Sequence, residues 1–458
     1  MSPCEPLPLT RAELNSSDIS QIVLEDFDVT SNGFLPDDQP LERLPSPYYE
    51  PWESLAKDLP VHLQDQTLRS LVDRLPILST THLKTESEWR RAYVILGFLT
   101  HGYVWGGDKA AEILPPPITI PLLAVSNHLS IPPVATYAAV NLWNFRSRSQ
   151  DFSVLDSLTA LHTYTGTPDE SWFYMVSVAM ESLGGRTLIP LLLSSLQACT
   201  SKNVPSLVTS LSEITSRINE LGNLLDRMDE HCDPSVFYHR IRPFLAGSKN
   251  MASAGLPKGV FYDEGNGKGE WRQLRGGSNG QSSLIQLLDV VLGVEHKVTG
   301  DSNPDRPGHG DGGKGMSFHQ EVRAYMPEGH RRFLAHVEER WPGGLRRGVE
   351  GLLDGVAAND DDERMRLRDA FRATTGALAA FRNRHLRIVT RYIVIPSRQA
   401  AAPGRVDKLN LATASSRLAK IEKQASVDVE LTGTGGTALL PFLKQSRDET
   451  FRAGELGR

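Results

Sequence analysis

The feature that most constrains this chain is the helical spacing of its apolar residues, which recurs in several long segments. In residues 203–232 they follow one another at intervals of three or four: Leu207, Leu211, Ile214, Ile218, Leu221, Leu225 and Met228. This period places them on one face of a helix or of two consecutive helices. No segment alternates as a β-strand does, and the chain has no internal repeat. The sequence therefore predicts an all-α fold, with further helices over residues 171–181, 188–196, 333–354, 364–393 and 439–450.

Prolines and glycines mark the segments that we expect to be non-helical. Pro115–Pro121 should be a loop or an extended segment, because proline is poorly tolerated in a helix interior. Residues 132–145 read as a helix whose two prolines stand in the first turn. Residues 246–280 are rich in Gly and Asn and read as a loop. Residues 297–315 are rich in Gly, Asp and Pro without periodicity, which is typical of a disordered insertion.

The length of the chain predicts more than one domain. Its 458 residues exceed the usual size of a single domain, so two packed domains are the expectation. We predict a small N-terminal helical domain over residues 1–165, which starts with an extended lead-in. A larger helical domain should follow over residues 166–458.

The charge balance and the cysteine content exclude several classes of protein. A net charge of −6, from 49 basic and 55 acidic residues, argues against a nucleic-acid surface. Cys4, Cys199 and Cys232 lie too far apart for a disulfide framework or a cysteine-based metal site, which suits a reducing compartment. No secretory signal is evident, and no apolar run reaches the ~18 residues that span a bilayer. We therefore expect a cytoplasmic monomer with no membrane or nucleic-acid partner.

The helix predicted over residues 369–393 carries the most informative histidine. His385 falls on the apolar stripe formed by Phe371, Leu378, Phe381, Ile388 and Tyr392. A histidine on such a face is most often a satisfied core residue. An imidazole that projects from a helix into an apolar space is also what a proximal haem ligand requires. Arg382, one turn earlier, would then be placed to meet a haem propionate.

A buried carboxylate and a glycine-rich loop stand next to each other in the sequence. Asp289 lies within the almost wholly apolar segment Leu284–Val294. It must be paired if it is buried, with the helix of Arg382 as a plausible source of the partner, or else lie at an exposed helix edge. The preceding loop Gly276–Ser283, with the sequence GGSNGQSS, either offers backbone N–H groups to an anion or forms a tight turn.

Two further polar side chains stand among apolar ones. Phe173, Ser177 and Glu181 recur at four-residue spacing, and a serine hydroxyl on such a face commonly bonds its own backbone. Arg242 is embedded among aromatic residues, where a guanidinium either extends to the surface or clamps a substrate carboxylate. No His-Glu-x-x-His zinc motif and no complete phosphate-loop motif are present. Of the scattered histidines, His319 lies beside the expected insertion.

Taken together, these segments resemble the indoleamine 2,3-dioxygenase family. Phe381–Pro396, with the sequence FRNRHLRIVTRYIVIP, is similar to the proximal-histidine signature of the family, and Gly276–Ser283 with Asp289 is similar to a second signature. The resemblance extends in register from about Tyr48 to Thr450. It implies haem b, a small N-terminal helical domain and a larger haem-binding domain. Further family-like blocks are Arg323–Pro327, His330–Leu334 and Gly433–Thr437.

The resemblance also implies which residues hold the cofactor. His385 would be the axial ligand of the haem iron. Asp289 and Arg382 would form a buried pair behind it, with Arg382 near a propionate. Gly277 and Ser278 of the glycine-rich loop would contact the cofactor.

On the substrate side, the resemblance implies a pocket to which both domains contribute. Arg242 would bind the substrate carboxylate, and Ser177, Phe237 and Arg242 would serve catalysis. Ser278 and Thr434 would lie near the amino-acid group of the substrate. The remaining wall residues would be Tyr137, Val140 and Phe173.

The implied reaction inserts both atoms of O2 into the indole ring of L-tryptophan and yields N-formyl-L-kynurenine, the first step of the kynurenine pathway. An electron donor would keep the iron ferrous. Two alternatives stay open. A low-turnover member of the family would act as a haem or tryptophan sensor, and the departures at Val140 and Asn279 would then lower substrate affinity. A haem-free helical scaffold would simply bury His385.

Overall fold

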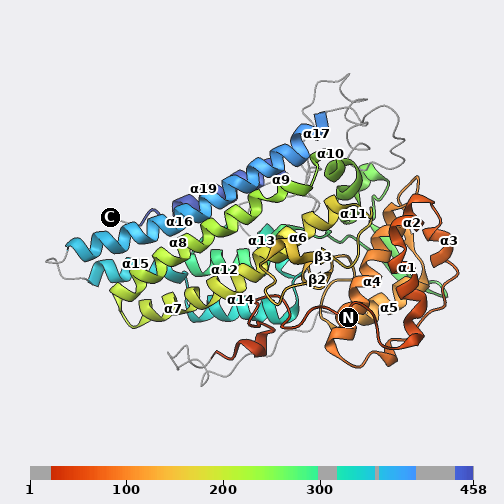
Figure 1. Ribbon diagram of the computed structural model, residues 1–458, viewed down its shortest axis with the longest axis horizontal. Coiled ribbons are helices and arrows are strands. Elements are labelled where there is room, and N and C mark those ends of the chain that lie inside the picture. Colours follow the sequence, from red (N-terminus) through yellow and green to blue (C-terminus); the bar gives the residue numbers. More distant parts are fainter. Residues whose placement is uncertain (1–21, 298–316, 356–360, 399–438, 457–458) are drawn as a thin grey trace.

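The structure is a computed structural model that describes residues 22–297, 317–355, 361–398 and 439–456. Helices dominate these residues, so the predicted all-α fold is confirmed (Figure 1). The expected insertion at residues 297–315 lies outside the described residues except for Lys297. Thr434 and the block Gly433–Thr437 also lie outside them.

The second half of the chain forms an elongated bundle in which long helices run side by side (Figure 1). The helix α16 packs along both α8 and α19. The helices predicted over residues 171–181, 188–196, 364–393 and 439–450 are confirmed, and the pair predicted over 203–232 is α8 with α9. The long helices are α6 (Pro168–Leu183), α7 (Ile189–Thr200), α8 (Val204–Asp226), α12 (Ser283–Leu292), α14 (Glu328–Arg340), α15 (Gly344–Gly355), α16 (Asp361–Val389) and α19 (Leu439–Ala453).

The single helix expected over residues 333–354 is two helices, α14 and α15. Gly343 and Gly344 separate them with φ angles of 75° and 56°, which glycine adopts without steric cost. Short helical segments connect the long ones: α9 (Met228–His231), α10 (Pro234–Val236), α11 (Arg242–Leu245), α13 (Phe318–Arg323) and α17 (Ile395–Arg398). Four π-helical turns occur in the described residues: η6 (Ala138–Leu142), η8 (Gly184–Leu188), η9 (Phe237–Ile241) and η12 (Thr390–Val394).

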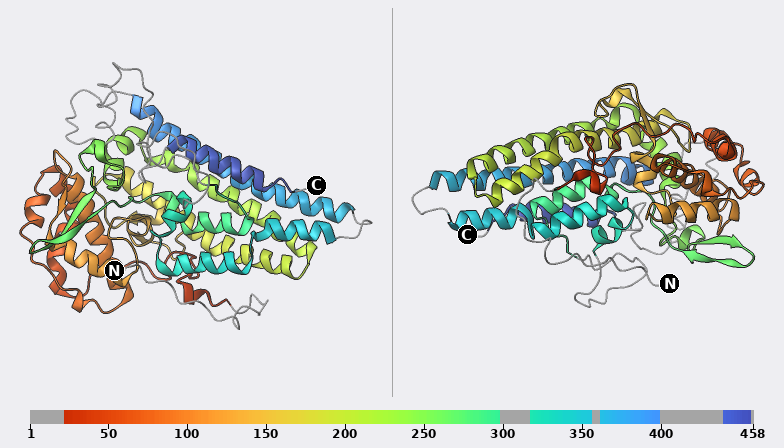
Figure 2. Two further views of the ribbon diagram at one scale, coloured as in Figure 1. Left: turned by 180° about the vertical axis from the view of Figure 1, so that it is seen from behind. Right: turned by 90° about the horizontal axis from the view of Figure 1, so that it is seen from below.

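The first half of the chain contributes a compact group of helices at one end of the bundle (Figures 1 and 2). They are α1 (Glu50–Lys57), α2 (Leu59–Gln64), α3 (Leu68–Val72), α4 (Glu86–Trp105) and α5 (Pro116–His128). The non-helical expectation for Pro115–Pro121 was wrong. Pro115 is the N-cap, the next two prolines stand in the first turn where no amide hydrogen is needed, and only Pro121 lies inside the helix.

Two other local predictions were also wrong. Residues 132–145 contain only the short turn η6 instead of a full helix. Residues 246–280 contain a hairpin of β4 (Val260–Gly265) and β5 (Lys268–Arg272), and β4 also pairs with β1 (Ile113–Leu114). Asn266 and Gly267 both have positive φ angles, which suits a tight hairpin turn. A second small sheet pairs β2 (Phe145–Ser147) with β3 (Leu158–Ala160).

The core consists of two hydrophobic clusters. One joins α4 and α5 to residues of α6, to η9 and to the hairpin strand β4, so the first half of the chain packs on segments of the second half. The other lies within the bundle, between α7, α8, α12, α14, α15 and α16. The domain boundary near residue 165 stays a prediction.

One helical run in the described residues is long and apolar enough to cross a membrane. It spans residues 168–200, through α6, η8 and α7. We expected no such run, because Pro190 and two serines interrupt the apolar residues. The helix nevertheless continues, since Pro190 stands in the first turn of α7. Its most apolar window is 72% buried inside the structure, as in the core helix of a globular fold.

A buried ion pair links α1 to α4 and generates a stability prediction. Arg91 donates to Glu53 at 2.6 Å, and the two side chains are only 3% and 4% exposed. We expect Arg91→Met to lower the free energy of unfolding by about 3–5 kcal/mol, because it leaves a buried carboxylate without its cation. The double variant Glu53→Gln with Arg91→Met should recover much of that loss. Urea denaturation of both variants tests this, and a loss under about 1 kcal/mol for Arg91→Met would contradict it.

Candidate functional site

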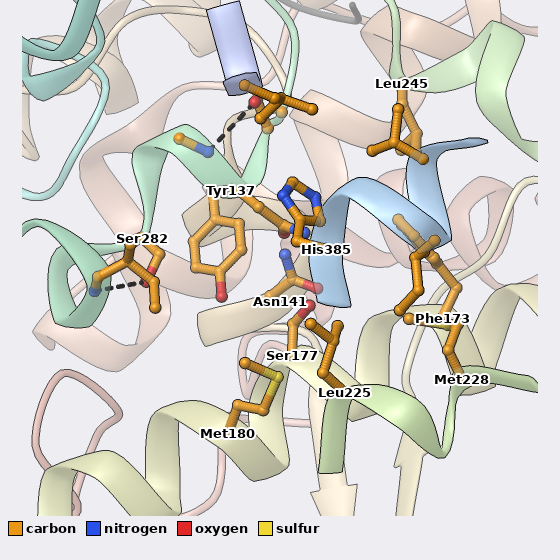
Figure 3. Close-up of a pocket in the computed structure, with 18 of the residues that line it drawn as sticks. Tyr137, Asn141, Phe173, Ser177, Met180, Leu225, Met228, Leu245, Ser282 and His385 are labelled. Atoms are coloured by element: carbon orange, nitrogen blue, oxygen red, sulfur yellow. Dashed lines mark hydrogen bonds between the residues drawn. The ribbon is translucent and has the colours of Figure 1, made fainter. Parts of the chain in front are cut away.

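A large and mostly apolar cavity opens between α6, α16, η9 and the loop that precedes α12 (Figure 3). Its volume of about 230 Å³ is far beyond a packing defect, since one water needs roughly 10–15 Å³ on the same measure. Residues from distant parts of the sequence meet in its wall. Among them are Tyr137, Val140, Phe173, Ser177, Phe237, Arg242, Gly277, Ser278, Arg382 and His385.

The helix α16 carries His385 into this cavity, and α8 fixes its orientation. The Arg384 guanidinium donates to the carboxylate of Asp226 at 2.5 Å. Beyond the helix end, the Tyr392 hydroxyl donates to the backbone carbonyl of Cys232 at 2.7 Å. The Arg384 contact holds α16 against α8, and His385 faces the cavity, in the same space as Asn141 (Figure 3).

The imidazole of His385 is neutral at physiological pH. Burial lowers its pKa to about 4, and the nearby positive charge of Arg382 acts in the same direction. Within the described parts of the chain, His385 makes no hydrogen bond, and its ring lines the cavity. A neutral imidazole nitrogen with an available lone pair is the form that binds a metal.

A buried ion pair lies behind His385. Arg382 donates to both carboxylate oxygens of Asp289, at 2.6 and 2.7 Å, and also contacts the hydroxyl of Thr450 on α19. Burial alone would raise the pKa of Asp289, but the charges of Arg382 and His296 hold it below the ordinary value. The sequence left two possibilities for Asp289, a buried carboxylate with a partner or a position at an exposed helix edge. The first is confirmed and the second is wrong, because Asp289 is paired with Arg382 and is only 4% exposed.

Aromatic rings form the wall next to Arg242. The ring centroids of Phe173 and Phe237 lie 4.6 Å apart, and Phe237 meets Tyr392 edge-on at 5.8 Å. The Arg242 guanidinium lies 5.6 Å from the ring centroid of Tyr238, and burial lowers its pKa. This arrangement gives the cavity flat apolar surfaces with one cation beside them.

A polar group lies opposite the aromatic wall, and its central residue is Glu181. One oxygen of its carboxyl accepts from the Tyr137 hydroxyl at 3.0 Å and from the Ser282 hydroxyl at 2.6 Å. Its other oxygen is buried and has no hydrogen-bond partner in the part of the chain that the structure describes. Burial raises the pKa of Glu181 to about 7, and the two hydroxyl donors only partly offset it.

The glycine-rich loop is held in place by the side chain of Gln281 and by a close backbone contact at Gly276. Gln281 accepts from the Tyr137 amide at 2.8 Å and donates to the Gly276 carbonyl at 2.8 Å. A Cβ on Gly276 would lie 2.0 Å from the carbonyl oxygen of Leu245, so only glycine allows this approach. The loop therefore brings Gly277 and Ser278 to the cavity, while Ser278 also caps the turn by accepting from the Gly280 amide at 3.2 Å.

The sequence analysis missed several residues of the cavity wall. Glu181 was visible as a polar position four residues after Ser177 on one helix face, but it was not assigned to the site. His319 lies in helix α13 and lines the cavity, whereas the sequence placed it only beside an insertion. Phe442, Leu443 and Ser446 come from α19, and no sequence signal connected that helix with the site.

An all-helical protein whose neutral histidine faces a large apolar cavity has the site of a haem-binding protein. Comparison with known proteins gives the family. The family model for indoleamine 2,3-dioxygenase matches residues 23–453. The chain belongs to the indoleamine 2,3-dioxygenase family, which is a family of haem-dependent dioxygenases.

Three relatives illustrate the extent of the similarity. The indoleamine 2,3-dioxygenase nanC of Aspergillus nanangensis is 38% identical over 445 residues, which cover 95% of this chain and 98% of the relative. The indoleamine 2,3-dioxygenase of Saccharomyces cerevisiae is 38% identical over 450 residues, covering 95% and 94%. The 6-hydroxytryptophan 2,3-dioxygenase fscD of Fusarium equiseti is 37% identical over 424 residues, covering 92% and 95%.

The residues of the cavity fit a haem group. His385 offers a neutral ring nitrogen that is not used in a hydrogen bond to any described residue. The surrounding wall is predominantly apolar, as the macrocycle requires. Arg382 lines the same cavity and brings a positive charge that suits a propionate.

Glu181 generates a prediction about pH and stability. Its pKa of about 7 in the folded state exceeds the ordinary value of 4.5, so stability is lost as pH rises between these values. Glu181→Gln keeps an acceptor but cannot ionise. As pH rises from 5 to 8, we expect the free energy of unfolding of the variant to increase by roughly 2–4 kcal/mol relative to that of the wild type. Denaturant unfolding at pH 5 and pH 8 tests this. If the free energies of unfolding of variant and wild type differ by the same amount at both pH values, the prediction is contradicted.

Proposed function

We propose that this chain opens the indole ring of L-tryptophan with both atoms of O2 and yields N-formyl-L-kynurenine, the first step of the kynurenine pathway. The observation that carries the proposal is His385, a neutral imidazole facing an apolar cavity that also contains Arg242. Membership of the family supports the dioxygenase reaction. The position of Arg242 beside aromatic rings supports an aromatic amino acid as substrate.

In this proposal His385 holds haem b through its neutral nitrogen. Arg382 meets a propionate, and Asp289 keeps the guanidinium oriented. Gly277 and Ser278 contact the cofactor from the loop that Gln281 fixes. When bound, the reduced haem iron supplies the activation of O2 that protein side chains cannot provide. An external electron donor keeps it ferrous.

The chain's own residues bind and orient the substrate. Arg242 pairs with the substrate carboxylate, and a bidentate guanidinium fixes its direction as well as its position. Phe173 and Phe237 hold the indole ring between flat apolar surfaces. Tyr137, Val140, Ser177 and Ser278 complete the pocket around it, and Thr434, which lies outside the described residues, is proposed to contact the amino-acid group.

A hydroxylated tryptophan is a second candidate substrate, and one observation favours it. Glu181 keeps one carboxyl oxygen without a partner among the described residues, and it lines the cavity. A ring hydroxyl would satisfy that oxygen, since a buried acceptor gains from each donor it meets. The name of the Fusarium equiseti relative gives 6-hydroxytryptophan as its substrate. The ratio of kcat/KM for L-tryptophan and 6-hydroxy-L-tryptophan distinguishes the two candidates.

We further propose that the protein acts as a cytoplasmic monomer. The described cysteines, Cys199 and Cys232, are free thiols, which supports a reducing compartment. The net charge of −6 supports the absence of a nucleic-acid partner.

Replacement of His385 tests the cofactor and the reaction together. We expect haem-loaded wild type to show a Soret band and to form N-formyl-L-kynurenine from L-tryptophan in air under reducing conditions. His385→Ala should lose both, because it removes the neutral imidazole that faces the cavity. His128→Ala, an exposed histidine that is stacked on Trp89, is the control and should keep both. A stable Soret band without product would favour the sensor alternative, and an undiminished Soret band in His385→Ala would overturn the ligand.

Replacement of Arg242 tests the substrate side. Arg242→Gln should lower kcat/KM for L-tryptophan by about 2–5 kcal/mol in transition-state free energy, because a buried charge pair is lost. Arg240→Gln removes a guanidinium from the adjacent π-helical turn η9 but not from the cavity wall, and should change kcat/KM little. Equal effects of the two substitutions would remove Arg242 from the proposed site. Steady-state kinetics with the Soret absorbance as a loading control gives the comparison.

A further inference from the structure

A cluster of two histidines and two carboxylates lies beside the Arg382–Asp289 pair. His296 Nε2 is 3.1 Å from Asp289 Oδ2, and His296 Nδ1 is 2.8 Å from Glu449 Oε2. The ring of His319 stacks on that of His296 with centroids 3.7 Å apart and planes 15° from parallel. We call Asp289, His296, His319 and Glu449 the two-histidine cluster.

We propose that the two-histidine cluster is a binding site for a divalent transition-metal ion such as Zn²⁺, with Asp289, His296 and His319 as its ligands. One ligand atom from each of the three lies within 4.8 Å of the others. Tetrahedral zinc with bonds of about 2.0–2.2 Å needs its donor atoms roughly 3.4 Å apart. The His296–Asp289 separation of 3.1 Å is close to this value, and the ligand atom of His319 lies within 4.8 Å of the other two.

The groups around these ligands have the arrangement of a metal site's outer shell. A metal-bound histidine usually gives its other nitrogen to a carboxylate, and Glu449 occupies that place on His296. A ligating carboxylate is usually hydrogen-bonded in turn, and Arg382 does this for Asp289. Glu449 is 6% exposed and Arg382 is 8% exposed, so this outer shell is buried.

His319 is the residue that the rest of the structure does not explain. Its ring nitrogens make no hydrogen bond to any residue in the described ranges, although burial and the charge of His296 lower its pKa to about 3 and keep it neutral. His319 lines the adjoining cavity, so a lone pair on its ring is available to a ligand. Metal coordination would use that lone pair.

Space and charge also favour a cation. A cavity of about 220 Å³ adjoins the cluster and is lined by all three proposed ligands, which leaves an open position for water. Two carboxylates, those of Asp289 and Glu449, face the Arg382 guanidinium and the His296 ring there. A metal ion would take the place of a proton on His296 Nε2 and would join α12, α13 and the segment after α12.

Zinc binding to the full-length, haem-loaded protein tests the proposal without any measurement of turnover. After equilibrium dialysis against micromolar free Zn²⁺, elemental analysis gives zinc per chain. We expect about one zinc per wild-type chain. His319→Phe keeps a ring to stack on His296 but has no donor nitrogen, and it should bind at least ~10-fold more weakly. His128→Phe removes a histidine that meets a carboxylate at 2.9 Å without a second histidine, and it should bind as the wild type does.

Zinc X-ray absorption of the wild type provides a second measurement that does not depend on the folding of a variant. We expect two imidazole nitrogens and at least one oxygen at about 2.0–2.2 Å. Absence of bound zinc in the wild type, unchanged binding in His319→Phe, or a spectrum with fewer than two imidazoles would each overturn the proposal. The cluster would then be a proton-linked ion network only. Because the zinc content is measured per chain, failure of the dioxygenase assay would not affect this result.

Discussion

Arg382 and Asp289 are both buried and meet through two hydrogen bonds, so removing either one would leave the other as an unpaired buried charge. Arg382 comes from α16 and Asp289 from α12, and the same guanidinium reaches Thr450 on α19. One buried cation therefore fixes three helices relative to one another. His385 follows Arg382 by about one helical turn. Formation of the Arg382–Asp289 pair therefore also fixes the rotation of α16 that points His385 toward the cavity. The cavity and its histidine depend on this constraint.

The cavity owes its shape to irregular backbone as much as to its helices. Three of the π-helical turns supply wall residues: Val140 from η6, Phe237 from η9, and Tyr392 from η12. A π-turn inserts one residue into a helix and shifts the following side chains around its axis, which is why such turns occur often at functional sites. Regular helices in these places would present different faces to the cavity. The irregularities thus keep open a space that regular packing would fill.

The sequence predicts those parts of the structure that follow from a repeated pattern. The apolar period of residues 203–232 and 364–393 is sufficient to predict α8 and α16, and the stripe through Phe381 and Ile388 places His385 on the inner face. A π-turn leaves no such pattern in the sequence, because only tertiary contacts offset the free energy that its irregular backbone costs. The stacking of His296 on His319 cannot be predicted from the sequence either. It depends on how the fold brings together two residues that lie far apart along the chain. Glu181 could be predicted in part. Its spacing of four residues from Ser177 places both on one helix face, but the sequence does not show that one of its carboxyl oxygens lacks a partner among the described residues.

A cavity of this size carries a free-energy cost in the protein that contains it, because the wall atoms lose packing partners roughly in proportion to the volume. The Arg382–Asp289 ion pair behind the wall and the hydrogen bond from the Gln281 side chain to the Gly276 carbonyl offset that cost. A ligand that binds only the folded state lowers the cost and shifts the folding equilibrium in proportion to its affinity. Haem bound in this cavity would therefore stabilise the fold as well as supply chemistry. The residues proposed to orient it, His385 and Arg382, lie on α16, which the folded core holds in place.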